Sequence, residues 1–442
     1  MKKLLVVFVI LALLSSCGGY VGGELTGVEG RRSLAEPQPL GMAFIPMGTY
    51  NMGQSDQDIN WAFYSTSKTV SVDAFWMDDT EITNNEYRQF VHWVKDSILR
   101  KAVGEMNEDY MITEDENGNE INPPILNWDL EIDMYDEEIR EVVNEYYYNQ
   151  DDQLYGRKEF DTRKLMYEYY WIDLKQAAVK KNRYNYETRR YDGNITNNMG
   201  EVVEIDSRSS FVIRDIVNVY PDTLAWIADF SYSFNEPYTT MYFWHPSYDN
   251  YPVVGVTWKQ ASAFAIWRTN YLNAYLKGVG EPFVHDYRLP LESEWEYAAR
   301  GGIDLQMYPW GGYYTRNNEG CFLANFKPLR GNYVDDGGLN TIPVGSYQPN
   351  DYGLYDMSGN VAEWTSNAFD ESAYSFTHDM NPDYKYNAKP NDPPVRKRKV
   401  IRGGSWKDIG YYLQNGTRTF EYQDTSKTYI GFRCVRSYLG GS

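Results

Sequence analysis

The chain has 442 residues, of which 42% are hydrophobic, so it can form one large domain or two of average size. It carries 62 acidic side chains against 42 lysines and arginines, which gives a net charge of −20. This balance argues against a nucleic-acid partner, because phosphates are bound by Lys and Arg. The 41 tyrosines suit either a contact surface or packing within loops, and the sequence leaves both open.

The N-terminus has the features of an export signal. Lys2 and Lys3 precede a short apolar run, Leu4–Leu14, which is followed by Cys17. The run is shorter than the roughly 20 apolar residues that a membrane-spanning helix needs. We therefore expect a lipoprotein signal peptide over residues 1–16, then a lipidated Cys17 and a flexible tether over residues 17–40. The alternative is an ordinary signal peptide with an incidental cysteine.

The first elements of the globular part are short. Gly41–Gly53 predicts two short strands around a glycine turn, and Val70–Met77 predicts a further strand. Thr83 begins a predicted helix over Glu86–Val94, whose apolar residues lie on one face.

Residues 97–245 are interpreted as an ordered insertion, because they are rich in Tyr, Trp and Ile. Residues 101–160 contain eighteen carboxylates and four cations, whereas residues 161–190 are basic. The dipeptides Asn117-Gly118 and Asp192-Gly193 predict hairpin turns. An acidic block followed by a basic block suits head-to-tail contacts between copies, and two solvated faces of one insertion suit the pattern equally well.

After the insertion, Pro252–Val256 predicts a buried strand. Thr257 and Gln260 have the spacing of a capping box, and a helix is expected to follow to about Leu276.

A short helix is expected over residues 292–299. It carries Glu294 and Glu296, which face different directions on a helix, so we expect them to anchor loops rather than to form an acid/base pair. Arg402 and Arg433, near the C-terminus, are expected to hold buried carboxylates or carbonyls with both arms of the guanidinium.

Three segments in the last third of the chain share one family pattern: Tyr287–Gly302, Pro343–Asn367 and Arg402–Arg436. Gly41–Gly53 and the residues from Glu81 to Phe90 match the opening of the same pattern. Together they resemble the formylglycine-generating-enzyme (sulfatase-modifying factor) family. The resemblance implies an α+β, loop-rich fold that is distantly C-type-lectin-like, formed by residues 41–96 and 246–442, with residues 97–245 as a large insertion.

Members of that family oxidise a substrate cysteine with two active-site cysteines that bind Cu(I). Counting from Trp406, the resemblance places these positions at Leu413 and Arg418, and neither side chain can ligate copper. It therefore implies an enzyme-derived fold without catalysis and without copper. The thiols of the globular part, Cys321 and Cys434, either pair or stay free, and the sequence does not decide between these states.

The resemblance also implies two structural calcium sites, and Ca²⁺ takes about six to eight oxygen ligands. The first set of ligands is Ser358, Gly359, Asn360, Val361 and Glu363. The second set is Asn325, Phe326, Asp336 and Gly338. The alternative is that these groups form hydrogen bonds within the loops and hold no metal.

One further stretch of the sequence resembles a smaller group of proteins that share this domain. Residues 210–272 resemble the outer-membrane lipoproteins of gliding motility and the type IX secretion system, the GldK/PorK group, to which GldJ is similar. This resemblance implies a protein on the periplasmic face of the outer membrane, held to the inner leaflet through Cys17. It also implies a structural subunit that self-associates into a ring with a periplasmic GldN/PorN-like partner. The alternatives are an envelope adhesin or glycan-binding module, and a formylglycine-generating-type oxidase.

Overall fold

The computed structural model describes residues 36–54, 67–114, 118–153, 156–197, 200–329, 332–335 and 337–440. The predicted signal peptide, Cys17 and most of the tether lie outside the described residues and stay predictions. Within these ranges, every helix is too short or too polar to cross a bilayer.

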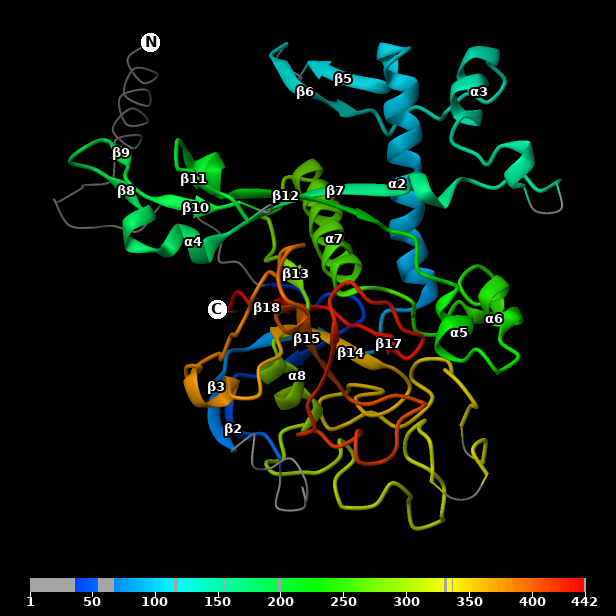
Figure 1. The fold of residues 1–442 in the computed structure, drawn as a ribbon, viewed down its shortest axis with the longest axis vertical. Coiled ribbons are helices and arrows are strands. Elements are labelled where there is room, and N and C mark those ends of the chain that lie inside the picture. The colour runs from blue at the N-terminus through cyan, green and yellow to red at the C-terminus, as the bar shows by residue number, and fades with distance from the viewer. Residues whose placement is uncertain are drawn as a thin grey trace, which may run out of the picture. The chain divides into compact units, whose positions relative to one another are not determined.

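The first sheet joins the start of the chain to its end. Its strand order is β1-β4-β18-β13, and all neighbours are antiparallel. The bounds are Met42–Ile45 for β1, Phe75–Asp78 for β4, Val435–Ser437 for β18 and Tyr287–Arg288 for β13 (Figure 1). A separate two-stranded ribbon pairs β2 (Gly48–Met52) with β3 (Lys68–Val72).

The second sheet carries two of the site residues, Glu363 and Arg402. Its order is β16-β15-β14-β17, with β14 parallel to β17 and antiparallel to β15. The bounds are Thr419–Tyr422 for β16, Arg398–Arg402 for β15, Ala362–Ala368 for β14 and Ile430–Gly431 for β17. Every residue of β14 is buried. The described residues between 300 and 361 contain neither a helix nor a ladder strand, so the loop-rich α+β fold is confirmed.

Two helices of 21 residues, α2 (Asn84–Gly104) and α7 (Trp258–Gly278), pack against each other. Each begins at a threonine whose hydroxyl accepts the backbone N–H of the third helical residue. The side chain of that third residue in turn accepts the backbone N–H of the threonine. These capping boxes are Thr83 with Glu86 and Thr257 with Gln260. Both predicted helix starts are therefore confirmed, and α7 ends close to the predicted position.

The insertion is built around a ribbon of β7 (Met166–Ile172) and β12 (Val212–Asn218). The ribbon packs on α7, and Tyr167 and Tyr169 belong to the same hydrophobic core as α2 and α7. Residues Gln38–Tyr438, insertion included, form one compact unit. The other elements of the insertion are β5 (Met111–Glu114), β6 (Glu120–Leu126), α3 (Glu137–Asn144), α4 (Leu174–Ala178), β8 (Tyr184–Asn185), β9 (Arg190–Tyr191), β10 (Asn194–Thr196), β11 (Val202–Glu204), α5 (Ala225–Asp229) and α6 (Glu236–Met241).

Two strand predictions differ from the structure. Gly41–Gly53 does contain two strands, but Val70–Met77 is divided between β3 and β4, which belong to different sheets. Pro252–Val256 is buried but is not a strand. Gly255 turns the backbone with φ +74° and donates its N–H to the carbonyl of Lys427, so the segment cannot continue a ladder.

The insertion also departs from expectation at two points. Asp192-Gly193 was predicted as a hairpin turn, but it connects β9 to β10, which pair with different partners. The predicted boundary at residue 97 falls inside α2, because the helix continues to Gly104. Asn117 lies outside the described residues.

Candidate functional site

The helix α8 (Glu292–Ala299) places three carboxylates inside the protein, and all eight of its residues are buried. Glu294 accepts the backbone N–H of Leu291 at 2.8 Å. Glu296 accepts the backbone N–H of Gly53, also at 2.8 Å. The prediction that these two side chains anchor loops is confirmed.

Arg418, which the sequence resemblance assigns to the second of the two cysteine positions, is held by Glu292. Its guanidinium donates to both carboxylate oxygens of Glu292, with Nη2 3.0 Å from Oε2. The side chains of Arg418 and Glu292 are 5% and 4% exposed. The hydroxyl of Tyr374 donates to the same carboxylate at 3.1 Å. Arg418 is therefore part of a buried ion pair and not a free surface cation.

Arg402, the last residue of β15, completes this cluster. It pairs with Glu296, donates from Nη1 to the carbonyl of Thr417 at 2.7 Å, and has its Nε 3.5 Å from Glu292. Arg300 also pairs with Glu296 at 2.7 Å. The predicted role of Arg402 is confirmed. Three guanidiniums thus face two carboxylates in the interior, so each carboxylate has at least one cationic partner.

The cluster keeps the carboxyl group of Glu292 ionised. Burial alone raises the pKa of Glu292, but Arg418 and Arg402 outweigh it, so the pKa lies below its ordinary value. Burial, and then the charge of Glu292, raises the pKa of the Tyr374 hydroxyl. A carboxylate that is ionised and saturated by donors is a poor proton acceptor, so the arrangement suits structure better than acid/base chemistry.

Leu413, which the sequence resemblance assigns to the first of the two cysteine positions, is fully buried in an apolar cluster. Its backbone carbonyl accepts the hydroxyl of Ser358 at 2.6 Å. The side chains around it are Met307, Tyr308, Phe322, Ala324 and Phe326. Leu413 is therefore a core residue, and an aliphatic side chain offers no ligand to a metal.

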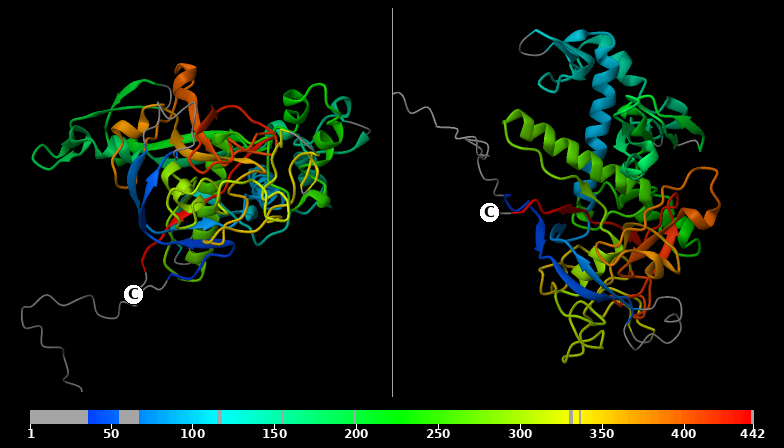
Figure 2. Two further views of the ribbon diagram at one scale, coloured as in Figure 1. Left: turned by 90° about the horizontal axis from the view of Figure 1, so that it is seen from below. Right: turned by 90° about the vertical axis from the view of Figure 1, so that its left-hand side faces the viewer.

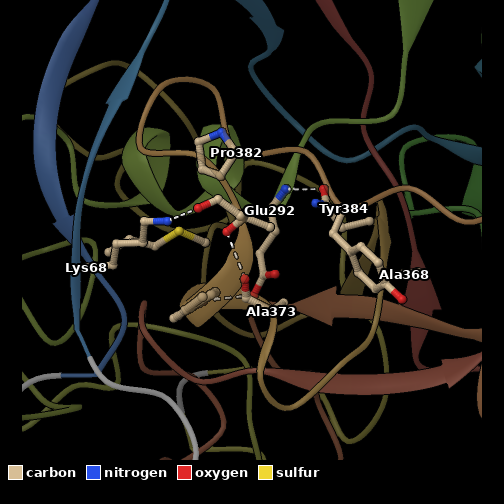
Figure 3. Close-up of a pocket in the computed structure, with 10 residues that line it drawn as sticks. Lys68, Glu292, Ala368, Ala373, Pro382 and Tyr384 are labelled. Atoms are coloured by element: carbon tan, nitrogen blue, oxygen red, sulfur yellow. Dashed lines mark hydrogen bonds between the residues drawn. The ribbon is translucent and has the colours of Figure 1, made fainter. Parts of the chain in front are cut away.

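A small cavity lies beside the Glu292 carboxylate (Figure 3). Its volume is about 10 Å³, which is at most the room of one water molecule. Lys68 closes one side by donating to the carbonyl of Thr377, and Tyr374 and Tyr384 are among the other lining residues. As lined by the described residues, the cavity has no room for a peptide substrate.

The first predicted calcium set is occupied by protein contacts. Both carboxylate oxygens of Glu363 accept from Arg433, at 2.6 and 2.8 Å, and one also accepts the indole N–H of Trp295 at 2.8 Å. The side-chain amide of Asn360 donates to Glu81, and its side-chain oxygen accepts the N–H of Ile342. This donor set does not fit a calcium ion that relies on Glu363. The bidentate role predicted for Arg433 is confirmed.

The other members of that set also form hydrogen bonds within the protein. Ser358 donates its hydroxyl to the carbonyl of Leu413, and the carbonyl of Asn360 accepts the N–H of Trp406. Gly359 and Val361 donate their N–H groups to Gly403 and Glu81, and these bonds do not involve the carbonyl oxygens that calcium would take. Gly359 has φ +87°, and a Cβ there would lie 2.5 Å from the carbonyl oxygen of Asn325, so glycine is needed for the close approach.

The second predicted calcium set is only partly described, because Asp336 lies outside the described residues. The carbonyl of Asn325 accepts the N–H of Asn360, and its side-chain amide donates to the carbonyl of Asn340. Phe326 packs against Phe322. Gly338 lies close to Ile342, whose Cγ2 would be 2.4 Å from a Cβ at this position. The set stays a prediction. Among the described residues, no three His, Cys, Asp or Glu side chains are grouped to hold a metal.

The two thiols are unpaired in the structure. Cys434 is buried and Cys321 is half-buried, and neither forms a disulfide. The question that the sequence left open is thus answered in favour of free thiols.

Sequence reasoning missed a second acidic cluster around Arg433. Glu81 and Asp356 both lie near Glu363, and Asp356 accepts the N–H of Gly345 at 2.6 Å. Burial, followed by the charges of Asp356 and Glu363, raises the pKa of Glu81. Burial raises the pKa of Asp356 to about 6. Both residues lie in family-matched segments, but nothing in their local spacing indicates that they share one guanidinium.

Comparison with known proteins places the chain in a family. The model for the sulfatase-modifying factor enzyme 1-like domain (FGE-sulfatase) matches residues 31–438. The formylglycine-generating enzyme of Streptomyces coelicolor is 34% identical over 190 residues, which cover 42% of this chain and 52% of the relative. The inactive C-alpha-formylglycine-generating enzyme 2 of Bos taurus is 34% identical over 191 residues, with coverages of 42% and 50%.

The matches thus span about half the length of these curated relatives. Among solved structures, PvdO from Pseudomonas aeruginosa aligns with a TM-score of 0.44 and 16% identity, over 90% of this chain and 94% of that one. The match to the family model over nearly the whole chain decides the assignment: the chain belongs to the sulfatase-modifying factor enzyme 1-like (FGE-sulfatase) family.

Proposed function

We propose that this chain is a non-catalytic outer-membrane lipoprotein that acts as a ring or scaffold subunit of the type IX secretion and gliding-motility machinery. In this proposal, lipidated Cys17 anchors it to the periplasmic face, where it self-associates and binds a periplasmic GldN/PorN-like protein. One observation supports the non-catalytic part: Leu413 and Arg418, which the resemblance assigns to the two copper-binding cysteine positions, are engaged in an apolar core and in a buried ion pair.

The contacts of Arg418 support the proposed loss of catalysis. Restoring a cysteine there would remove the bidentate partner of Glu292 and leave that buried carboxylate with Arg402, whose Nε is 3.5 Å away. Such a change destabilises the protein before it creates a copper ligand. A relative whose name describes it as inactive is consistent with repeated loss of activity in this family.

A binding role is supported by aromatic side chains that are exposed rather than packed in the core. Residues 210–272 carry the resemblance to the secretion and gliding lipoproteins, and within them Tyr232 and Phe234 are almost fully exposed. Exposed aromatic side chains of this kind are enriched at protein interfaces.

The test is affinity purification of the tagged full chain from detergent-solubilised envelopes, followed by mass photometry and protein identification. We expect a particle much larger than the 51.5 kDa chain, containing a second periplasmic protein. A monomer that persists in several mild detergents would overturn the proposal.

Two further measurements address the alternatives. Protease treatment of intact cells is expected to leave the chain uncut, whereas an adhesin on the cell surface would be cleaved. Titration of the purified chain with Cu(I) is expected to give no tight binding, and stoichiometric binding would favour the oxidase.

A further inference from the structure

The insertion has two ends of opposite charge. The acidic end comprises residues 105–114 and 118–152, with the β5–β6 hairpin and α3, and contains fifteen carboxylates and one cation. The basic end comprises residues 174–197, with α4 and the β8–β9 hairpin, and contains six cations and two carboxylates.

The β7–β12 ribbon keeps these ends apart. The acidic end precedes β7 in the chain and the basic end follows it, so the seven-residue strand lies between them (Figures 1 and 2). A strand of that length spans roughly 20 Å, at about 3.3 Å per residue. Salt screens charges over about 8 Å at physiological ionic strength. The two ends therefore do not neutralise each other within one copy.

Most of these charges are available for contact. The ion pairs at the two ends use Arg140 with Glu137, Arg163 with Asp152, Lys175 with Asp383, and Arg190 with Asp192. Glu138 and Glu141 on α3, and Lys180 and Lys181 after α4, are exposed and have no ion pair among the described residues.

Both ends also expose large apolar side chains next to the charges. The acidic end exposes Trp128 (42%) and Tyr135 (95%), and the basic end exposes Leu174 (70%) and Tyr186 (86%). Interfaces combine aromatic anchors with a polar, charged rim. The two ends thus have opposite charges, and both expose the apolar surface that a stable contact needs.

We propose that the acidic end of one copy docks on the basic end of the next copy. This inference rests on the self-association in the proposed function and adds the surfaces that carry it. A contact between two different surfaces of identical chains is heterologous, so it repeats around a closed ring when its rotation closes. Charge complementarity also selects the register, because two acidic or two basic ends repel.

The experiment uses the full chain, purified from detergent-solubilised envelopes and measured by mass photometry. One variant exchanges two charges on α3 of the acidic end (E138K/E141K), which lowers the net charge of that end from −14 to −10. A second exchanges two charges of the basic end (K180E/K181E), which brings the net charge of that end from +4 to 0. The control K277E/K327E changes the net charge by the same −4 as K180E/K181E, at exposed framework lysines. Melting temperatures of all variants are measured first, and those at these exposed positions are expected to stay close to that of the wild type.

Each insertion variant alone is expected to lose the large particle, while the control keeps it. An equimolar mixture of the two insertion variants is expected to restore it. Alternating copies would join an unchanged acidic end to an unchanged basic end, and at the next junction the α3 that carries E138K/E141K to the basic end that carries K180E/K181E, so the local charges are opposite at every junction. Retention of the particle by either variant alone, or no restoration in the mixture, would overturn the inference while leaving the proposed function intact. Restoration that requires the periplasmic partner would assign the surfaces to that partner and also overturn it. A wild-type chain that never assembles contradicts the proposed function itself.

Discussion

Arg418 is a buried cation whose stability depends on one partner. It donates to both oxygens of Glu292, and both side chains are about 5% exposed or less. Removing one member of such a pair leaves an uncompensated charge, which typically costs about 3–5 kcal/mol, whereas removing both costs far less. We expect Arg418→Met to lower the free energy of unfolding by less than this amount, because the Nε of Arg402 stays 3.5 Å from Glu292. Urea unfolding at neutral pH measures it.

The double variant Arg418→Met/Glu292→Gln is the matched control. It is expected to recover part of the stability lost by Arg418→Met, because the buried carboxylate is then neutral. Equal losses in the single and double variants would show that the pair is not the source of the effect.

The raised pKa of Asp356 predicts that the stability of the protein depends on pH. Its folded-state pKa is raised to about 6 by burial, above the ordinary value of 3.8. Its protonated form therefore favours folding, so this contribution is complete below pH 3.8 and is lost as pH rises through about 6. Asp356→Asn keeps an oxygen for the Gly345 N–H and removes the charge. At pH 7.5 we expect the variant to be more stable by about 2–3 kcal/mol.

Unfolding of this variant and the wild type in urea between pH 4 and 8 tests the sign. The difference is expected to shrink as pH falls below 6. A variant that is less stable than the wild type at pH 7.5 would mean that the carboxylate is needed in its charged form, paired with Arg433.

Among the elements, the helix starts were the most predictable features. Thr257 and Gln260 are three residues apart, so the capping box depends only on local sequence and was read correctly. The strands depend on distant partners. Nothing within Pro252–Val256 shows that the N–H of Gly255 donates to Lys427. The site has the same limit, since Arg418 and Glu292 are 126 positions apart and only the fold brings them together.

The cap of α7 can be tested directly. The hydroxyl of Thr257 accepts the N–H of Gln260 at 3.2 Å, and loss of such a cap costs about 1 kcal/mol. We expect Thr257→Ala to show this loss in thermal unfolding and Thr257→Ser, which keeps the hydroxyl, to show much less. Gln260 also donates to the carbonyls of Asn218 and Tyr220, so Gln260→Ala is expected to cost more than Thr257→Ala. A larger loss for Thr257→Ala than for Gln260→Ala would mean that the Thr257 hydroxyl alone provides the stabilisation by the cap.

For the whole molecule, the sequence predicts an ordered insertion over residues 97–245, and the structure packs its β7–β12 ribbon into the same core as α2 and α7. Tyr167 on β7 packs edge-to-face on Phe90 of α2, with ring centroids 5.2 Å apart. The same core includes Phe264 of α7. Deleting residues 97–245 would therefore remove core side chains, so partner binding is better tested by substitutions at the insertion's ends.

If insertion and framework fold together, a core substitution on β7 should destabilise both. Tyr167 is 8% exposed and Tyr170, on the opposite face of the same strand, is 56% exposed. We expect Tyr167→Ala to cost about 3–5 kcal/mol and Tyr170→Ala less than about 0.5 kcal/mol. Hydrogen exchange then shows whether the destabilisation is global or confined to the insertion. We expect Tyr167→Ala to lower amide protection in α7 as much as in β12, because the two elements unfold together. Loss of protection confined to the insertion would mean that it unfolds independently, and the chain would then behave as two cooperative units.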